Sequence, residues 1–333
     1  MQTRTLPVAE ARSLVIDTLI RCGTAPQNAA SVAEALIGAE LTGQYGHGLR
    51  RVPLYAGHVL SGRVDGHAAP RVRKTRPGTL LVDAMNGFAY PAMDLALAEL
   101  PQMARENGIA MAGIGGSHHC GVAGLPVEAL ARQGCIAIFM ANAPAAMAPW
   151  GGRRPIFGTD PIAFAAPLDG AEPVVVDISL SKVAKGKVMA AVQRGEPIPE
   201  GWALDADGNP TTDAAAAMKG TMVPMGEAKG TALAIMVEML CAGLTGANFA
   251  YEAPSFFALE GDPMNTGQAI LVIDATAMAP GATARFAELA SQIEGMEGAR
   301  LPGRRRQQIR RDLLTSGIEV DDSLYAEIEA LGR

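Results

Sequence analysis

The chain has 333 residues, of which 49% are hydrophobic and 19% charged, so it contains enough apolar material for a large core, which excludes a disordered protein. The formal net charge of −6 excludes a general nucleic-acid binder, which needs an extended basic face. No apolar run is long enough to cross a bilayer, and the N-terminus lacks a signal-peptide pattern. Four scattered cysteines are typical of reduced thiols, so we expect a cytoplasmic protein. From its charge and hydropathy we expect no nucleic-acid or membrane partner.

The first third of the chain reads mainly as helix. Hydrophobic residues recur at helical spacing, which predicts helices over residues 8–20 and 25–41. After a segment rich in glycine and proline, we expect a strand at residues 80–83. A helix then follows at residues 91–106, and Pro101 inside it is expected to kink or divide that helix.

The middle of the chain has short apolar runs bounded by Gly, Pro and polar residues, which suit buried strands. The predicted strands are residues 109–114, 136–141, 162–166, 174–178 and 270–273. The predicted helices among them are residues 123–133, 181–194 and 231–244. From residue 282 the pattern is helical again. We therefore expect residues 1–75 and 280–333 to form one helical domain, with residues 76–279 inserted as a second domain.

Neither familiar phosphate-loop fingerprint is present. The nearest match to G-x-G-x-x-G spans residues 113–118 and ends in His118, and no helix opens there. The pair Gly186-Lys187 lacks the upstream glycine of a Walker A motif. The common dinucleotide-binding motif and the P-loop are both excluded.

His47 lies between glycines, shortly before Arg51 and Tyr55. A histidine titrates near neutral pH and suits general acid catalysis, and an arginine can bind a carboxylate through two parallel hydrogen bonds. Pro53 places the start of the next helix close to itself, so that His47 lies in the preceding loop. The residues alone leave open an ordinary loop histidine beside surface arginines.

The run from Ser117 to Cys120 contains two adjacent histidines, which suggests a metal site. Neighbouring side chains on a strand point to opposite sides, however, and no further ligand motif is present. We therefore expect no metal, and instead a strand-to-helix loop whose free N–H groups can bind a phosphate. A metal-dependent hydrolase using His118, His119 and Cys120 is one alternative, and a non-catalytic ligand-binding module is another.

Three further loops carry candidate residues. Thr159 can hydrogen-bond a substrate oxygen or simply form a turn. Asp177 ends an apolar strand and can bind a ribose, while Ser179 or Ser181 can cap the helix that follows. Lys229 opens an apolar helix and can hold a phosphate.

These features occur in one order along the chain. The runs are His47-Gly48-Leu49-x-Arg51-x-Pro53-x-Tyr55, Ser117-x-His119-x-Gly121, Pro149-x-Gly151-Gly152, Gly158-Thr159-Asp160-Pro161, Lys185-Gly186-Lys187, Ile198-Pro199-x-Gly201-Trp202, Asp207-Gly208-x-Pro210-Thr211-x-Asp213, Lys229-Gly230 and Leu301-Pro302-Gly303. Together they resemble the malate/L-lactate dehydrogenase family of the second type, which includes ureidoglycolate and sulfolactate dehydrogenases and Δ1-piperideine-2-carboxylate reductases. The resemblance covers residues 7–325, approximately.

The resemblance implies an α+β or mixed α/β, non-Rossmann fold. In it, a strand-rich, largely antiparallel cofactor domain is inserted between helical N- and C-terminal segments, and the protein is a homodimer. The implied reaction is hydride transfer between NAD(P)H and C2 of a small 2-oxo acid, as in malate, lactate or sulfolactate dehydrogenases. The alternative is a reductase of cyclic 2-imino acids, Δ1-piperideine-2-carboxylate or Δ1-pyrroline-2-carboxylate. For a sulfonated substrate, Arg153 and Arg154 are candidates to meet the second anionic group.

The resemblance also implies residue roles. His47 or His119 is the acid/base, and Arg51, Tyr55 and Thr159 bind the small carboxylate substrate. The residues implied to bind NADPH or NADH are His119, Cys120, Gly121, Val122, Ala123, Asp177, Ile178, Ser179, Lys229, Gly230, Arg304, Arg305 and Arg306. The arginine cluster favours NADPH, since arginine suits a 2′-phosphate.

Two positions depart from the family's pattern. Gly46 stands where the family usually has a serine before the histidine, and in the imine reductases that serine belongs to a proton relay. Any relay in this chain must therefore use another hydroxyl, such as that of Tyr55, or water. Asp160 stands where asparagine is more usual, next to Thr159.

Overall fold

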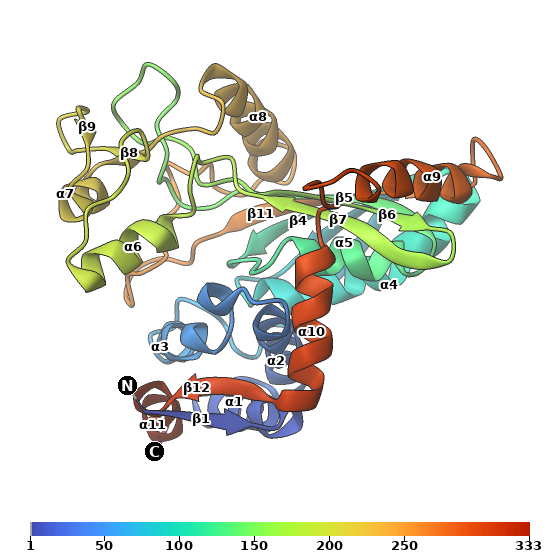
Figure 1. The fold of residues 1–333 in the computed structure, drawn as a ribbon. Helices are drawn as coiled ribbons and strands as arrows, with labels where there is room; N and C mark the ends of the chain where they lie inside the picture. Colours follow the sequence, from blue (N-terminus) through green and yellow to red (C-terminus); the bar gives the residue numbers. More distant parts are fainter. Residues whose placement is uncertain (1) are drawn as a thin grey trace.

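The computed structural model describes residues 2–333 (Figure 1). Its centre is a seven-stranded sheet in the order β2-β3-β4-β11-β5-β6-β7. The pair β3 and β4 is parallel, and every other neighbouring pair is antiparallel. The fold is therefore mixed α/β with a mostly antiparallel central sheet, as expected from the sequence.

The apolar runs of the sequence form six of the seven strands of this sheet, all except the edge strand β2. The bounds are β2 (Arg71–Arg76), β3 (Thr79–Asp83), β4 (Ile109–Ser117), β5 (Cys135–Ala141), β6 (Ile162–Leu168), β7 (Ala171–Ile178) and β11 (Thr266–Asp274). Strand β2 was not predicted, because its sequence RVRKTR contains no apolar run. It lies at the edge of the sheet, where exposed cationic side chains discourage pairing with another chain.

Helices cover both faces of the sheet (Figure 1). On one face lie α4 (Ala89–Asn107) and α5 (Gly124–Ala131), whose apolar sides join the strands in the main core. On the other face α9 (Ala282–Glu294) packs against β6. Pro101 lies inside α4, which continues as one helix and is not divided.

The two ends of the chain lie side by side. Strand β1 (Thr3–Leu6) pairs antiparallel with β12 (Ile318–Asp321), and neither strand was predicted. The helices of this region are α1 (Val8–Arg21), α2 (Pro26–Leu41), α3 (Val52–Leu60) and α11 (Asp322–Ala330). Helix α10 (Arg304–Ser316) runs from the sheet towards the chain ends in Figure 1, and it packs on α2.

A third region lies at the end of the sheet opposite α9 (Figure 1). It contains α6 (Lys185–Arg194), α7 (Ala214–Lys219), α8 (Ala228–Glu238), a π-helical turn η3 (Met239–Gly243) and the short strands β8 (Ala203–Leu204), β9 (Pro210–Thr211) and β10 (Thr221–Met222).

The predicted cap of α6 is wrong. The residue before α6 is Ala184, so neither Ser179 nor Ser181 caps the helix. The Ser181 hydroxyl instead donates to the carbonyl of Val183, at 2.8 Å. Among residues 2–333, no helix has the length and apolar content needed to cross a bilayer.

Candidate active site

Short helical turns position the first group of candidate residues. His47 ends the 3₁₀ turn η1 (Tyr45–His47), and Arg51 ends η2 (Leu49–Arg51), directly before α3. Gly48 joins the two turns, and a Cβ there would overlap the Glu40 carboxyl group. That carboxyl accepts a hydrogen bond from the Leu49 amide at 2.7 Å. A side chain at position 48 would therefore displace the Glu40 carboxyl group and its bond to Leu49.

His47 and His119 lie together, although 72 positions separate them in the sequence. Their rings stack with centroids 5.2 Å apart and planes 10° from parallel. Nδ1 of His119 is 2.8 Å from the hydroxyl of Tyr55, which is 2.9 Å from the hydroxyl of Tyr90. His118 takes part in a different contact, with Nε2 lying 3.0 Å from Nδ1 of His58. The adjacent histidines thus have different hydrogen-bond partners.

The hydrogen bonds of the two tyrosines indicate the tautomer of His119. Both tyrosine side chains are buried. If Tyr90 donates to Tyr55 and Tyr55 donates to Nδ1 of His119, every buried hydroxyl proton has an acceptor. The opposite direction leaves the Tyr90 proton without one, which is unfavourable for a buried donor. The neutral His119 ring therefore carries its proton on Nε2, which makes no hydrogen bond within residues 2–333.

Arg51 is largely buried beside these rings. Its guanidinium carbon lies 4.9 Å from the ring centre of Phe256 and 5.7 Å from that of Phe257. Its Nε atom is buried without a hydrogen-bond partner, and no acidic residue within 2–333 forms an ion pair with it. A guanidinium that forms no ion pair and is largely shielded from water is suited to bind an anion.

Burial and charge also act on the two histidines. Burial, and then the positive charge of Arg51, lower the pKa of His47 to about 4. Burial, the neighbouring His47 and Arg51 lower the pKa of His119 well below its usual value. Both rings are therefore neutral at pH 7 in the free protein. An anion bound at Arg51 would cancel part of this effect and raise both pKa values.

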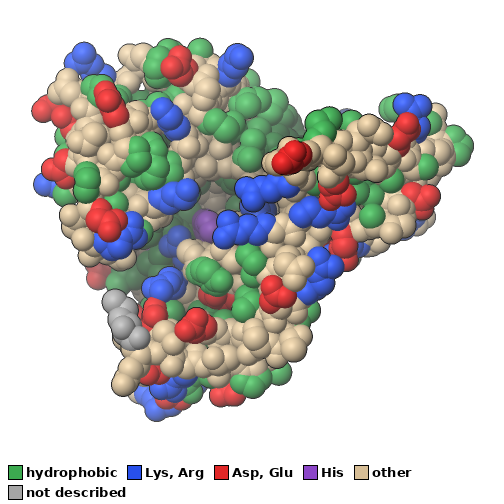
Figure 2. All heavy atoms as spheres, viewed as in Figure 1, with side chains coloured by type: hydrophobic (Ala, Val, Ile, Leu, Met, Phe, Trp, Pro, Cys, Tyr) green, Lys and Arg blue, Asp and Glu red, His purple; other side chains and the backbone are tan. Residues whose placement is uncertain are grey.

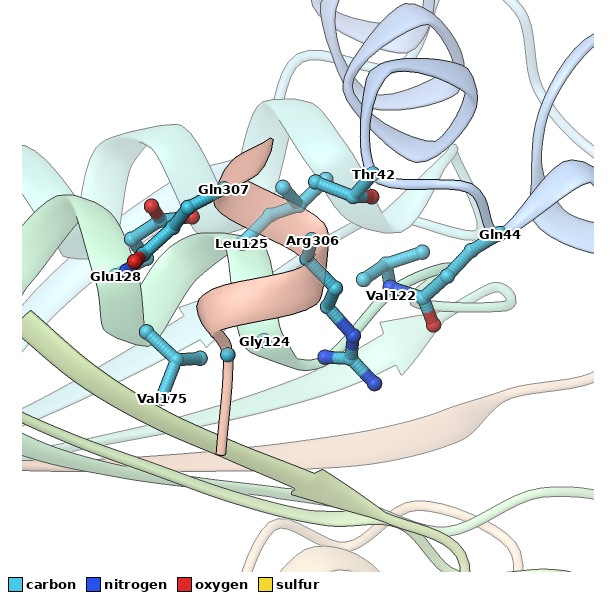
Figure 3. Close-up of a pocket in the computed structure, with 10 residues that line it drawn as sticks. Thr42, Gln44, Val122, Gly124, Leu125, Glu128, Val175, Arg306 and Gln307 are labelled. Atoms are coloured by element: carbon cyan, nitrogen blue, oxygen red, sulfur yellow. The ribbon is translucent and has the colours of Figure 1, made fainter. Parts of the chain in front are cut away.

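A second group of candidate residues lies at the start of α5. Nη1 of Arg306 is 2.9 Å from Oδ2 of Asp177, at the end of β7. A Cβ at Gly124 would lie 3.0 Å from each of these two atoms. Figure 3 shows Arg306 extending from α10 into a small pocket, towards Val122 and Gln44. A guanidinium and the first N–H groups of a helix are a suitable combination for a phosphate.

The other predicted cofactor residues differ in their surroundings. Arg304 forms an ion pair with Glu294, at 2.6 Å, and Arg305 is exposed. Cys120 is buried, and burial together with nearby Asp177 raises the pKa of its thiol to about 12, so it is an unreactive thiol. The segment from His119 to Gly124 connects the histidine group with the Arg306 group.

Thr159 and Lys229 are held by contacts of their own. The carbonyl of Thr159 accepts a hydrogen bond from the Leu180 amide at 2.8 Å. Lys229 is exposed in the first turn of α8, and Gly230 packs against the backbone of Met225. No hydrogen bond or ion pair within residues 2–333 joins Thr159 or Lys229 to the histidines.

Three aromatic residues of the site were missed from the sequence. Tyr90 falls within the apolar pattern of α4 and looks like a core residue. Phe256 and Phe257 lie in an irregular segment, and Phe256 packs on His119 with ring centroids 4.7 Å apart. Two adjacent phenylalanines in a polar loop were the signal that could have identified them, since aromatics there need a packing partner.

The surface around the site is basic. Figure 2 shows a hollow in the surface, with a histidine visible at its base and Lys and Arg side chains around it. The protein as a whole is acidic, with a net charge of −6. A local basic hollow on an acidic protein concentrates small anions. Within residues 2–333, no group of three or more His, Cys, Asp and Glu side chains is arranged to hold a metal ion.

Comparisons with known proteins identify the family of the chain. The family described as malate/L-lactate dehydrogenase matches residues 6–329. The chain is 47% identical to a (2R)-3-sulfolactate dehydrogenase (NADP(+)) of Chromohalobacter salexigens, over 98% of each chain. It is 39% identical to a Δ1-pyrroline-2-carboxylate/Δ1-piperideine-2-carboxylate reductase of Pseudomonas syringae pv. tomato, over 99% of this chain and 96% of the relative.

The fold is shared with solved structures. The crystal structure of Δ1-piperideine-2-carboxylate reductase from Pseudomonas syringae pv. tomato superposes with a TM-score of 0.92 at 37% identity. The match covers 98% of this chain and 99% of that chain. The protein therefore belongs to the malate/L-lactate dehydrogenase family.

Proposed function

We propose that the protein is an NAD(P)-dependent oxidoreductase that transfers a hydride between NAD(P)H and C2 of a small 2-oxo acid. The observation that carries this proposal is Arg51, which has a buried, unpartnered Nε and forms no ion pair within residues 2–333, beside the stacked rings of His47 and His119. The carboxylate of a 2-oxo acid supplies the missing negative charge. Its C2 oxygen then lies within reach of a proton donor.

His119 is the acid/base in this proposal, and His47 lies against it. A catalytic histidine needs a third group that fixes the ring, and Tyr55 does this through its bond to Nδ1. His47 has no such partner, because its Nδ1 is buried without a hydrogen bond. Substrate carboxylate at Arg51 raises the pKa of His119, so that binding favours the protonated ring which gives its proton to the C2 oxygen.

Tyr55 takes the position of a relay hydroxyl. Its side chain is fully buried, and its hydroxyl joins His119 to Tyr90. This arrangement provides a hydroxyl near the histidines in a chain that has Gly46 instead of serine. We therefore assign Tyr55 to holding His119, and Thr159 to contact with the substrate.

The nicotinamide cofactor supplies the hydride. Its proposed binding residues are those named from the sequence: 119–123, 177–179, 229–230 and 304–306. Arg306 beside the first turn of α5 fits a phosphate of the cofactor. The named NADP(+) cofactor of the Chromohalobacter relative supports NADPH as the preferred form.

We extend the proposal to domain organisation and assembly. Residues 76–279 would form the NAD(P)-binding unit, of non-Rossmann type, inserted between residues 1–75 and 280–333. A homodimer is supported by α8, η3 and the residue after them, which expose several large apolar side chains: Leu233, Ile235, Met236, Met239 and Leu244. Figure 2 shows hydrophobic side chains gathered over this part of the molecule. Four buried, unpaired cysteines suit a reducing compartment such as the cytoplasm.

A reductase of cyclic 2-imino acids is the second candidate. Phe256 and Phe257 form an apolar wall beside Arg51, which suits a carboxylate attached to a hydrophobic ring. The 39% identical relative is named as such a reductase. A sulfonated 2-oxo acid is supported by the 47% identical relative, but Arg153 and Arg154 are both exposed, and Arg153 packs over Gly208.

A substrate screen tests the proposal. NADPH and NADH are first titrated by fluorescence, and oxidation is then measured with pyruvate, oxaloacetate, sulfopyruvate and the two cyclic imines. We expect tighter binding of NADPH and turnover with one substrate class, and loss of turnover in Arg51→Ala with cofactor binding retained. Absence of cofactor binding, or equal turnover in Arg51→Ala, contradicts the proposal. Molar mass from light scattering tests the homodimer.

A further inference from the structure

Asp160 occupies an unusual backbone position next to the candidate substrate residue Thr159. Its side chain is completely buried, and its φ angle is +39°, in the left-handed region. Few residues other than glycine adopt this region, although Asp and Asn tolerate it better than most. Pro161 follows and restricts the backbone further. Such a conformation persists only where the surroundings hold it.

The carboxyl group of Asp160 lies near a second buried acid, Glu238 of α8. Within residues 2–333, neither carboxyl oxygen of the Asp160 side chain has a hydrogen-bond partner, and Oε1 of Glu238 has none either. Oε2 of Glu238 accepts from the Ala250 amide at 3.1 Å and from Nδ2 of Asn142 at 3.3 Å. Through these two bonds Glu238 connects two segments. One begins at Asn142, directly after β5, and leads to Thr159; the other passes through Ala250 and leads to Phe256.

Within residues 2–333, neither acid forms an ion pair with a basic side chain. Burial and Glu238 act to raise the pKa of Asp160, while nearby backbone N–H groups act to lower it. Burial and Glu252 act to raise the pKa of Glu238, and its hydrogen-bond donors act to lower it. The buried thiol of Cys241 also faces the pair. Burial raises the pKa of Glu238 to about 7. Burial and repulsion by Glu238 raise the pKa of Asp160 well above its usual value.

We propose that Asp160 is held as a neutral carboxylic acid beside Glu238, and that this neutral state positions Thr159 for the substrate. Two charged carboxylates in this enclosed space would repel each other and draw in water. Movement of Asp160 would displace Thr159, which is its direct neighbour and is otherwise held through the Leu180 amide. Asp160 is thus a positioning residue. The role of Thr159 rests on the proposed function.

The variant Asp160→Asn tests the proposal, because asparagine has the shape of the neutral acid, tolerates positive φ and cannot ionise. Unfolding temperature and steady-state kinetics are measured from pH 6 to pH 9. A raised pKa in the folded state means that the folded protein binds more protons than the unfolded one, so the stability of the wild type falls as pH rises. The control is Asp169→Asn, in the exposed turn between β6 and β7.

We expect the unfolding temperature of Asp160→Asn to exceed that of the wild type by an amount that grows by about 2 °C or more over this pH range. The control should follow the wild type. We also expect KM of the wild type to rise about threefold or more above pH 8, with KM of Asp160→Asn nearly constant and kcat similar.

A temperature difference that is independent of pH would overturn the neutral-acid assignment. A pH-dependent temperature difference without a change in KM would overturn the positioning of Thr159. If no 2-oxo or 2-imino acid is turned over, the proposed function fails, and the unfolding measurement still decides the protonation state of Asp160.

Discussion

Two regions of the molecule contain a partly buried arginine, and they differ in whether an acid compensates its charge. Around Glu128, Arg310 forms two hydrogen bonds to the carboxylate, at 2.7 and 2.6 Å, and Arg132 adds a third at 2.9 Å. These bonds lower the pKa of Glu128 although burial acts to raise it. Around Arg51, by contrast, two neutral histidines and two phenylalanines surround a guanidinium that has no acid within residues 2–333.

The difference separates structural charges from functional ones. The Glu128 cluster is electrically complete, and it links α5 to α10 as part of the folded structure. The charge of Arg51 has no such partner, so we expect it to add little to stability and to be available for an anionic substrate. Catalytic sites commonly hold such perturbed groups in a cleft. Variants in the two regions should therefore divide into those that affect activity and those that affect stability.

The largest effect is expected for His119→Ala. Removal of a positioned acid should reduce kcat by about 10³-fold, and the affinity for NADPH should fall much less, because His119 is only one of several proposed cofactor contacts. Steady-state kinetics and fluorescence titration measure the two quantities. His67→Ala, which changes an exposed histidine, serves as the control. If His119→Ala turned over substrate at the rate of the wild type, His119 would not be the acid, and His47 would be the remaining candidate.

Replacement of Arg51 by methionine should separate activity from stability most clearly. We expect kcat/KM for the carboxylate substrate to fall about 100-fold, since the charge-assisted bonds are lost. The unfolding temperature should stay equal or rise, because a buried charge without a partner is removed. The exposed neighbour Arg50, which pairs with Asp321, supplies the control Arg50→Met. A lower unfolding temperature with unchanged kcat/KM would show that Arg51 stabilises the fold and does not bind substrate.

Arg310→Ala should show the reverse behaviour. Loss of two hydrogen bonds to the buried carboxylate of Glu128 should reduce the free energy of unfolding by about 2 kcal/mol, with Arg132 retaining part of the interaction. Denaturant unfolding measures this change, and kcat should remain within about twofold of the wild type. The neighbouring exposed Arg311→Ala is the control. An active-site defect of the size found for Arg51 would remove the distinction between the two regions.

The smallest effect is expected for Tyr55→Phe. Without the hydroxyl, Nδ1 of His119 loses its partner, so kcat should fall about tenfold while the ring of residue 55 continues to fill the core. The pH profile of kcat should also shift, because the hydrogen bond affects the protonation of His119. Tyr45→Phe, at an exposed tyrosine, is the control. An unchanged profile would exclude Tyr55 from holding His119.

Much of the local structure could be predicted from the sequence alone. Hydrophobic periodicity indicated α1, α2, α4 and the interior strands, because helix and strand geometry is repeated in the spacing of apolar residues. The edge strand β2 and the terminal pair β1 and β12 carry mainly polar residues, and they are strands only because a partner strand accepts their hydrogen bonds. Motif order indicated the family, and it named His47, Arg51 and His119 without bringing them together.

By itself, the sequence determined the helix and strand periods, the family and the candidate chemistry of single residues. Tertiary structure decided which residues meet. His119 is joined to Tyr55 across 64 positions, and Arg306 to Asp177 across 129. It also decided that Arg51 is left without an acid, whereas Arg310 has one. The physical reason is that backbone periods are set by neighbours along the chain, while burial and charge compensation are set by segments that packing brings together.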